Sequence, residues 1–317
     1  MHKFLRDFSG QNGTKAVSAR RFSADRSNPD LANCWVVQED ALNIEVADVG
    51  AYTLMWTPTE DAVASGFVAG EGVLGTEHVP ERLALAAGFA FSEGIIGGLQ
   101  DIASMEVCPE RPDIVRMRLV DPTKAKVRRS NVLMTSSCGV CGGRDVLEGE
   151  MVGFPEISTT LRMSVDDFLP LMEAMRQRQA VFSTTGGAHA AMIFSADRQI
   201  LAIAEDLGRH NALDKAIGLC LLRQQPIAGC GAMLSSRLSF EMIAKSARAG
   251  LEMVAAVSAP SSLAIATAER LGITLCGFVR GECATVYTHP ERIRELQKTP
   301  ESTQQPAAAT RAGAGLP

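Results

Sequence analysis

The sequence predicts an α/β protein, in which a C-terminal domain with a mixed sheet and flanking helices follows a smaller α+β N-terminal domain. Strand-like and helix-like segments alternate through the second half of the chain, which is typical of helices packed on a sheet. The first half carries several strand-like runs and one long helical pattern. With 317 residues, 46% of them hydrophobic and 21% charged, the chain is long enough for about two domains. We expect these domains to cover residues 36–150 and 151–298.

The N-terminal domain is expected to begin with two strands, because residues 41–46 and 52–56 are rich in β-forming side chains. A proline near the start and a glycine at the end bracket the alanine-rich run 80–94, and this polarity favours a helix. Two further strands are predicted over residues 115–120 and 130–134. Together these elements predict the α+β character of this domain.

The C-terminal domain is expected to open with a helix over residues 165–175, because Ser164 begins a capping-box sequence and apolar residues follow at helical intervals. Residues 181–185 predict a strand, and Asn211 is expected to cap a helix that begins at Ala212. The other predicted strands cover residues 190–195, 199–204, 227–234, 253–257, 274–279 and 284–287, and the other helices cover residues 212–223, 240–249 and 262–271.

The two ends of the chain differ from these domains in composition. Residues 1–35 are poor in large apolar side chains and carry more Lys and Arg than Asp, so we expect a mobile basic arm. Residues 299–317 have no periodicity and predict a disordered tail. A formal net charge of -5 argues against wholesale nucleic-acid binding. Since no apolar run reaches the ~18 residues of a membrane span and the polar start lacks a signal-peptide stretch, we expect a cytoplasmic protein with no membrane partner.

The eight cysteines are too dilute for a small disulfide-bonded scaffold, and most lie in apolar context, as Cys220 does, which predicts reduced core thiols. Cys138 and Cys141 are different. They lie in the run Thr-Ser-Ser-Cys-Gly-Val-Cys-Gly-Gly at residues 135–143, where glycines oppose a regular element and offer no apolar surroundings. This run predicts a loop that carries exposed thiols.

Several kinds of chemistry use such a C-x-x-C pair. A structural zinc site needs about four ligands, and without a second C-x-x-C pair no structural metal is expected. A thioredoxin-like dithiol would open a helix, which the surrounding glycines oppose, and an inert pair would need apolar burial. A sulfur-carrying thiol fits better, because a flexible loop can accept a terminal sulfur from a persulfide and move it to an acceptor. Arg128, Arg129 and Arg144 flank the loop and either lower the thiol pKa or are ordinary solvated charges.

Other candidate ligand contacts lie near the ends of predicted strands in the C-terminal domain. Glycines there can bring backbone N–H groups close to a phosphate, and arginine offers a planar fork suited to it. Each candidate also has an alternative explanation without a ligand: the glycines form a tight turn, the histidine is a hydrogen-bonded core residue, and the arginines are solvated charges. Charged residues elsewhere on the helices are expected to lie on solvated faces. The candidates are Thr185, Gly186, Gly187, His189, Arg209, His210 and Arg280.

Six strings in the sequence carry a resemblance to a known family. They are TSSCGVCG at 135–142, TGGAH at 185–189, EDLGRHNALDK at 205–215, SRLSFEM at 236–242, SAPSSLA at 258–264 and TLCGFVRG at 274–281. These strings resemble those of the FdhD family, the formate dehydrogenase accessory sulfurtransferases. The resemblance covers roughly residues 44–293, and the long string at 205–215 is highly specific.

The resemblance implies a C-terminal domain like the cytidine deaminase fold, a homodimer and a sulfur relay. In that relay a cysteine desulfurase loads a persulfide on Cys138, with Cys141 as its partner, and the sulfur passes to the molybdenum cofactor, a bis-molybdopterin guanine dinucleotide, for formate dehydrogenase. A guanine nucleotide would mimic one end of this cofactor. The family's cofactor-contacting segment matches Phe278, Val279, Arg280, Gly281, Glu282 and Cys283.

Alternatives from other classes remain at this point. A cofactor-binding chaperone would hold the guanine-containing cofactor without transferring sulfur, and a thiol-disulfide redox protein would use the same cysteines. A zinc deaminase would use the implied fold directly. Against the deaminase, His189 is followed by two alanines without the glutamate of that chemistry, and the C-x-x-C pair precedes the histidine.

Overall fold

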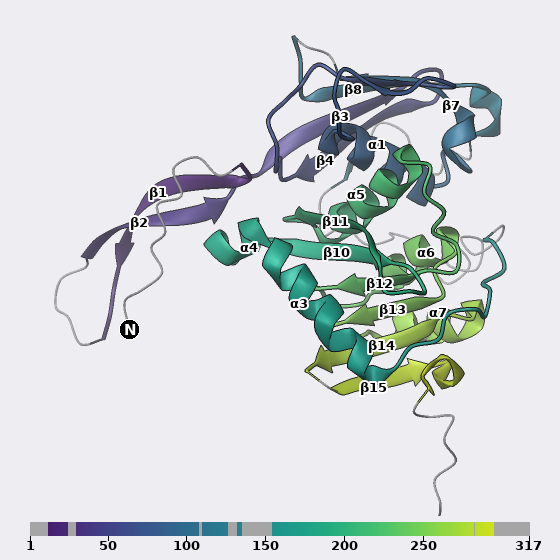
Figure 1. Cartoon of the computed structure of the whole chain (residues 1–317). Helices are drawn as coiled ribbons and strands as arrows, with labels where there is room; N and C mark the ends of the chain where they lie inside the picture. Colours follow the sequence, from purple (N-terminus) through teal and green to yellow (C-terminus); the bar gives the residue numbers. More distant parts are fainter. Residues whose placement is uncertain are drawn as a thin grey trace, which may run out of the picture.

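The computed structural model describes residues 12–24, 30–107, 110–125, 132–134, 154–281 and 283–294. In this part of the chain two large sheets with associated helices form the body, and a two-stranded hairpin projects from one side (Figure 1). This arrangement confirms the predicted α/β class. Both cysteines of the 135–143 loop, Glu282 and the expected tail at 299–317 lie outside the described residues.

The sheet of the N-terminal half has the strand order β6-β5-β7-β8-β3-β4-β9. Its strands are β3 (Asp40–Val46), β4 (Gly50–Trp56), β5 (Gly66–Val68), β6 (Gly72–Leu74), β7 (Ile102–Val107), β8 (Ile114–Leu119) and β9 (Val132–Met134). Alternate side chains of β3 and β4, such as Leu42, Ile44 and Leu54, are buried, as expected for a sheet with one face on the core. Helix α1 (Glu81–Ser92) packs into the same core.

The sheet of the C-terminal half has the order β11-β10-β12-β13-β14-β15, and its central strands β12, β13 and β14 are parallel. Its strands are β10 (His189–Phe194), β11 (Ile200–Asp206), β12 (Gly231–Leu234), β13 (Met253–Ala256), β14 (Thr274–Arg280) and β15 (Cys283–Thr288). Every residue of β12 and β13 is buried, because helices cover both faces. Helix α3 (Phe168–Arg178) packs on one face, and α5 (Arg209–Leu222), α6 (Phe240–Arg248) and α7 (Ser262–Leu271) pack on the other.

Helices α1 and α5 join the two halves by direct backbone contact. A Cβ atom added at Gly88 would lie 1.8 Å from the Asp214 carbonyl oxygen, and one at Gly218 would lie 1.8 Å from the Ala84 carbonyl oxygen. Only glycine permits so close an approach. The large hydrophobic core therefore continues from one sheet to the other through this helix pair.

The N-terminal segment differs from the expected mobile arm. Its described residues form the antiparallel hairpin of β1 (Thr14–Arg21) and β2 (Asp30–Val37), with eight paired positions. Trp35 and its valine neighbours favour a strand, and cross-strand pairing outweighs the high content of polar residues. The sequence did not predict this hairpin, and the mobility of the basic arm over residues 1–35 stays a prediction.

Two predictions near the start of the C-terminal half are wrong. Residues 181–185 belong to a short helix, α4 (Ala180–Thr185), because the Glu205 carboxylate accepts hydrogen bonds from the backbone N–H groups of Val181 and Phe182. Asn211 is not a cap, since α5 already begins at Arg209 after the N-cap Gly208.

The other predicted elements are confirmed, with boundary shifts of a few residues. The capping box at Ser164 forms, and it opens a 3₁₀ turn that runs into α3. Among the described residues no helix is long and apolar enough to cross a bilayer. The two large sheets fall on either side of residue 150, and the division into domains at 36–150 and 151–298 stays a prediction.

Candidate functional site

One edge of the six-stranded sheet collects the ends of five strands. The parallel strands β12, β13 and β14 end there, β11 ends there as well, and the antiparallel β10 begins there. Backbone hydrogen bonds continue along this edge, from Ser235 N to Ala190 O at 3.0 Å and from Phe278 N to Ser258 O at 3.2 Å. In α/β proteins the crevice at the carboxyl ends of parallel strands is the usual place for a ligand.

All predicted contact residues that the structure describes gather at this carboxyl edge. His189 pairs with Asp206 across β10 and β11, and α5 begins three residues after Asp206. The edge residues are Thr185, Gly186 and Gly187 after α4, His189 on β10, Arg209 and His210 on α5, Phe278, Val279, Arg280 and Gly281 at the end of β14, and Cys283 on β15. Segments that are far apart in sequence therefore form one surface.

Phe278 has an unusual conformation on this edge. Its φ of 51° lies in the left-handed region, which is costly for a large non-glycine residue, and its side chain is 44% exposed. The pairing of β14 with β15 shifts between Gly277 and Arg280, so Phe278 lies in an irregular stretch of the ladder. Val279 points into the core instead. The backbone thus exposes the Phe278 ring to solvent, although a phenylalanine side chain is usually buried in the core.

Two turns at the edge leave open space for a ligand. Gly186 has a φ of 70° and Gly281 a φ of 55°, and a Cβ atom at either position would meet no atom of the described residues within 4 Å. Open space beside left-handed backbone lets N–H groups face an anion. Gly187, in contrast, packs against Val37 of the hairpin, which lies 3.0 Å from the position of an added Cβ.

The edge is electropositive around His189. Burial, and then the nearby guanidinium groups of Arg209 and Arg237, lower the pKa of His189 below its ordinary value of about 6.5, so its ring is neutral at pH 7. The Nε atom of Arg209 is buried and has no hydrogen-bond partner among the described residues. Arg237, which follows β12, was not among the sequence candidates; its place in the string 236–242 was the available signal.

His210 is held by a carboxylate. Its Nε2 atom lies 2.8 Å from Oε2 of Glu241, at the start of α6. Burial works to raise the pKa of Glu241, but the adjacent His210 ring outweighs it, so the pKa of this carboxyl lies below its ordinary value. The contact is an ion-pair approach without hydrogen-bond geometry, and it places Glu241 against the His210 ring.

Two adjacent acidic residues at the end of β11 organise the edge, and sequence analysis assigned them no role. Glu205 accepts from the first turn of α4, which leads into the Gly186 turn. Asp206 accepts through Oδ1 from Gly208 N at 2.8 Å and from Asn211 Nδ2 at 3.0 Å, which fixes the start of α5. Burial raises the pKa of Glu205, although the α4 N–H groups act in the opposite direction.

Lys215 is completely buried beneath this corner, so the expectation that helical charges are solvated is wrong here. It lies in a helix that is otherwise apolar on most sides, and that pattern was the signal for a buried charge. Burial works to lower its pKa, but Asp206 and Glu81 outweigh it and keep the ammonium group charged. The ammonium contacts are Thr57 O at 2.8 Å, Glu205 O at 3.0 Å, Asp206 Oδ2 at 2.7 Å, a Glu81 carboxylate oxygen and the Trp56 ring at 4.8 Å.

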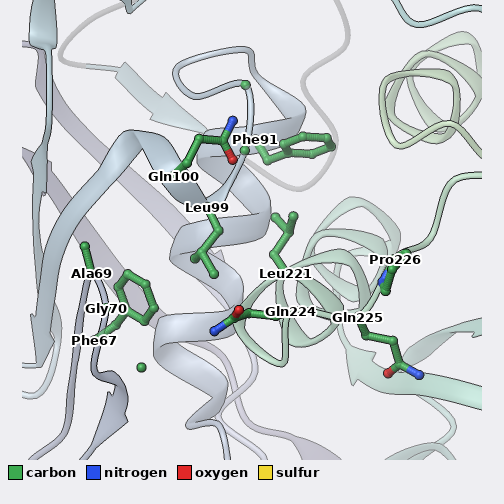
Figure 2. Close-up of a pocket in the computed structure, with 13 residues that line it drawn as sticks. Phe67, Ala69, Gly70, Phe91, Leu99, Gln100, Leu221, Gln224, Gln225 and Pro226 are labelled. Atoms are coloured by element: carbon green, nitrogen blue, oxygen red, sulfur yellow. The ribbon is translucent and has the colours of Figure 1, made fainter.

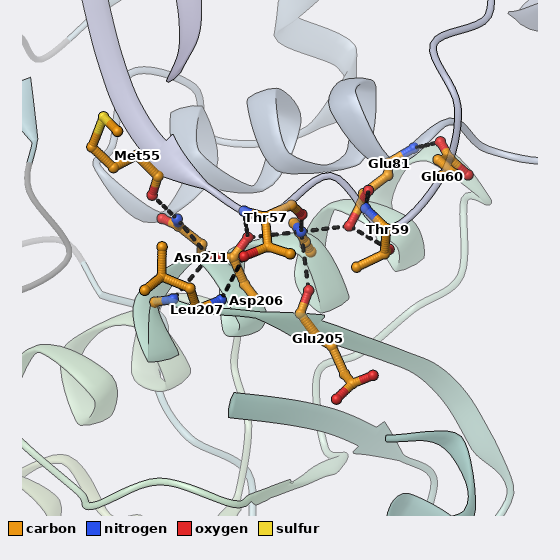
Figure 3. A network of polar contacts seen from close by, with 11 residues as sticks. Met55, Thr57, Thr59, Glu60, Glu81, Glu205, Asp206, Leu207 and Asn211 are labelled. Carbon is orange, nitrogen blue, oxygen red and sulfur yellow. Dashed lines mark hydrogen bonds and ion pairs between the residues drawn. The ribbon is translucent and has the colours of Figure 1, made fainter. Parts of the chain in front are cut away.

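The same corner holds the end of β4 (Figure 3). Thr57 N donates to Asp206 Oδ2 at 3.0 Å, and Asn211 Nδ2 donates to Met55 O at 2.7 Å. Strand β9 runs parallel to β4, with Met134 opposite Leu54. The strand that leads toward the C-x-x-C pair therefore ends beside the corner that positions Arg209 and His210.

The chain that follows the cysteine segment is also tied down. The buried carboxylate of Glu252 accepts from Thr160 N at 2.9 Å and from Leu161 N at 2.7 Å. Its ionic partner is the buried Arg292, whose Nε lies 3.3 Å from Oε2. Both described flanks of residues 135–153 are therefore anchored to the body.

A separate pocket of about 580 Å³ lies between the β5–β6 turn and the C-terminal ends of α1 and α5 (Figure 2). Phe67, Leu99 and Leu221 form its apolar wall, and Gln100 and Gln224 add amides. It has no charged lining residue and none of the predicted contacts. No group of three or more His, Cys, Asp or Glu side chains within the described ranges is arranged to hold a metal ion.

Comparison with known proteins agrees with the resemblance of the sequence strings. The sequence model of the FdhD/NarQ family matches residues 76–294, well over half of the chain. The chain belongs to the FdhD/NarQ family. A sulfur carrier protein FdhD of Sulfurisphaera tokodaii is 39% identical over 293 residues, which cover 92% of this chain and 98% of that protein. Its counterpart in Bordetella bronchiseptica is 41% identical over 265 residues, covering 81% and 87% of the two chains.

The fold is likewise shared with a solved structure. A putative formate dehydrogenase accessory protein from Desulfotalea psychrophila superposes with a TM-score of 0.67 over 89% of this chain and 99% of that chain. Its sequence is 21% identical, so this comparison bears on the fold alone.

The described cysteines of this FdhD/NarQ-family chain separate into two kinds. Burial raises the pKa of Cys220 and of Cys276 to about 12, which makes both thiols inert and confirms the prediction of core thiols. Cys230 is buried as well. Cys283 is exposed on the carboxyl edge. The assignment of Cys138 and Cys141 as the reactive pair concerns residues outside the described part and stays a prediction.

Proposed function

We propose that this protein is a sulfurtransferase that carries sulfur on Cys138 from a cysteine desulfurase to the molybdenum cofactor of formate dehydrogenase. The observation that carries the proposal is the gathering of predicted contacts at one sheet edge, beside the strand that leads to Cys138. A relative named as a sulfur carrier protein aligns over 92% of the chain, which supports the same role. We further propose a cytoplasmic homodimer as the working form.

The loading step follows from thiol chemistry. The Cys138 thiolate attacks the terminal sulfur of the desulfurase persulfide, so a new S–S bond forms and the desulfurase cysteine leaves as a thiolate. Cys141 has a role in release. Attack of its thiolate on the inner sulfur of Cys138 would form a Cys138–Cys141 disulfide and free the outer sulfur as hydrosulfide, with both electrons supplied by the cysteine pair. An external thiol then reduces the disulfide before the next cycle.

The carboxyl edge fits the nucleotide ends of a bis-molybdopterin guanine dinucleotide. Phe278 offers an exposed ring on which a guanine base can stack. Arg209 and Arg237 supply positive charge for phosphates, and the open turns at Gly186 and Gly281 supply backbone N–H groups. When bound, the cofactor presents its metal centre as the sulfur acceptor.

The length of chain between Met134 and Cys138 limits where the cofactor can bind. Cys138 lies four positions after Met134 in the sequence, and four residues of fully extended chain span at most about 14 Å. Because β9 pairs with β4, and the end of β4 is bonded to the start of α5, the carboxyl edge lies next to the strand pair from which the cysteine segment continues. A nucleotide held at this edge would place its acceptor end toward that segment.

The test is to incubate the protein with a cysteine desulfurase and cysteine and to measure the mass of the peptide that contains Cys138. We expect the addition of one sulfur atom, about 32 Da, that a thiol reductant removes. The Cys141→Ala variant should keep the adduct, because its remaining thiol still performs the loading attack. Protein that supports formate dehydrogenase maturation but never shows the adduct would refute the proposal and favour a cofactor chaperone.

A further inference from the structure

Two buried lysines clamp helix α1 at opposite ends. Lys215 bonds to Glu81, the first residue of α1, and Lys245 lies 3.1 Å from Glu93, which follows its last residue. Each lysine also has a buried aspartate partner, Asp206 at 2.7 Å for Lys215 and Asp214 at 2.9 Å for Lys245. The two clusters thus have the same chemistry and share the helices α1 and α5.

Their other contacts differ. Among the described residues the hydrogen-bond partners of Lys245 are all carboxylates, which lie on or next to the helices it joins, and its ammonium group also lies 6.0 Å from the centre of the Phe89 ring. Lys215 also donates to two backbone oxygens, Thr57 O just after β4 and Glu205 O near the end of β11. Main-chain hydrogen bonds fix where a strand end lies, whereas a carboxylate on a flexible side chain can move with its partner. Lys215 therefore determines how two strand ends meet.

We propose that Lys215 is a positioning residue for sulfur delivery. Its ammonium group holds Asp206, whose carboxylate fixes the Gly208 turn and the first residues of α5, including Arg209 and His210. This inference rests on the proposed function, because the step it serves is delivery to a cofactor bound at the carboxyl edge.

The same ammonium group also holds the end of the strand beside β9, the last described strand before the cysteine segment. Through Thr57 it holds the end of β4, and β9 lies beside β4 on the way to Cys138. Asn211 adds a second link, because its amide donates both to Met55 O and to Asp206 Oδ1. The end of β4, which pairs with β9, and the start of α5 are thus held at one buried hydrogen-bonded corner.

The experiment compares Lys215→Met with Lys245→Met, two replacements that each remove one buried ammonium group and keep an unbranched side chain. Lys245 lies one turn after Glu241 on α6, but its ammonium group makes no bond to Glu241 or to His210 among the contacts of the described residues. Three quantities are measured for each full-length variant: the melting temperature, loading of Cys138 by the desulfurase, and binding of guanosine diphosphate.

We expect both variants to melt at lower temperature and to load sulfur within about 2-fold of the wild type, because loading needs only the cysteine segment. Lys215→Met should weaken binding of guanosine diphosphate about 10-fold relative to Lys245→Met, since small displacements of binding groups have large effects. Sulfur delivery to formate dehydrogenase should fall with it. If the two variants lose affinity and delivery in proportion to their melting temperatures, Lys215 is merely structural and the inference fails.

Asn211→Ala gives an independent result if Lys215→Met does not fold. It removes one of the links between β4 and the corner without leaving a buried charge unpaired, so the protein should fold. We expect reduced delivery with unchanged loading, and full delivery would overturn the inference. Wild-type protein that gains no sulfur on Cys138 would refute the proposed function instead, so the two failures can be told apart.

Discussion

The two buried lysine clusters show how one kind of interaction can serve different purposes in the same molecule. Both pair an ammonium group with carboxylates in the contact region between the two halves. The Lys245 cluster connects helices α1, α5 and α6 through side chains. The Lys215 cluster connects helices with the ends of β4 and β11, where the candidate site begins. The difference lies in what each cluster holds.

The two clusters also show what buried ion pairs contribute to this fold. A buried ion pair is seldom more stabilising than apolar residues of the same volume, but removal of one partner is strongly destabilising. Such a pair therefore specifies an arrangement more than it adds stability. At Lys215 the specified arrangement includes backbone atoms of the candidate site, which an apolar side chain could not bind.

The largest effect on stability is expected at the contact between α1 and α5, because both lysine clusters depend on it. Gly218→Ala would place a Cβ atom 1.8 Å from the Ala84 carbonyl oxygen and force α1 away from α5. We expect a loss of more than about 5 kcal/mol in the free energy of unfolding, or no folded protein, measured by denaturant titration. Gly97→Ala is the control, because its Cβ would meet only the Asp101 carboxylate at 3.3 Å. Equal stability of the two variants would contradict the described helix contact.

The two lysine replacements should come next in size. Lys215→Met and Lys245→Met each leave buried carboxylates without their cation, so each should lower the free energy of unfolding by about 3–5 kcal/mol. Lys124→Met, at an exposed side chain, should change it by less than about 0.5 kcal/mol. Urea unfolding of the three variants measures these values. A neutral effect at either buried lysine would remove the basis of the comparison.

The reactivity of the described cysteines measures how tightly α5 and the six-stranded sheet are packed in the folded protein. At pH 8 and with the protein folded, iodoacetamide should modify the exposed Cys283 but not Cys220 or Cys276, because burial raises the pKa of those two thiols to about 12. Peptide mass spectrometry measures the pattern, and denatured protein is the control in which all three react. Rapid labelling of Cys220 in the folded wild type would contradict the tight packing of α5.

The smallest effect on stability is expected from Glu205, whose carboxylate lies next to the Lys215 cluster. Burial raises the pKa of Glu205 above its unfolded value, so the folded protein binds this proton more tightly than the unfolded chain. The wild type should therefore gain stability relative to Glu205→Gln as the pH falls through the folded pKa toward the ordinary value of about 4.3. Melting curves of both proteins between pH 7 and pH 4 measure the difference. A difference that shrinks on acidification would contradict the direction of this shift.

Local sequence patterns were sufficient for most of the fold. The helix near Glu81 and the strands around Ile44 and Val254 have periodic apolar residues, and each formed where the pattern predicted it. The exceptions depend on distant partners. Residues 181–185 have the composition of a strand, but a carboxylate from β11 caps them as a helix. Propensity cannot anticipate a partner more than twenty residues away.

The candidate site was predicted in part. The positions of His189, Arg209 and Phe278 followed from motif strings, and the structure places them on one edge. The buried role of Lys215 did not follow, because a lysine on a helix is usually solvated. Only the fold shows that Asp206 and Glu81, which are 125 positions apart in the sequence, approach the same ammonium group.

The central claim is that sulfur reaches the cofactor through Cys138, and the maturation of formate dehydrogenase tests it most directly. Cells that lack the endogenous protein are supplied with the wild type, Cys138→Ala or Cys220→Ala, and formate dehydrogenase activity is measured at equal protein levels. We expect Cys138→Ala to restore less than about 1% of wild-type activity, because the attacking thiolate is gone. Cys220→Ala, which changes a buried inert thiol, should restore most of the activity. Full activity with Cys138→Ala would contradict the account and leave a cofactor chaperone as the better description.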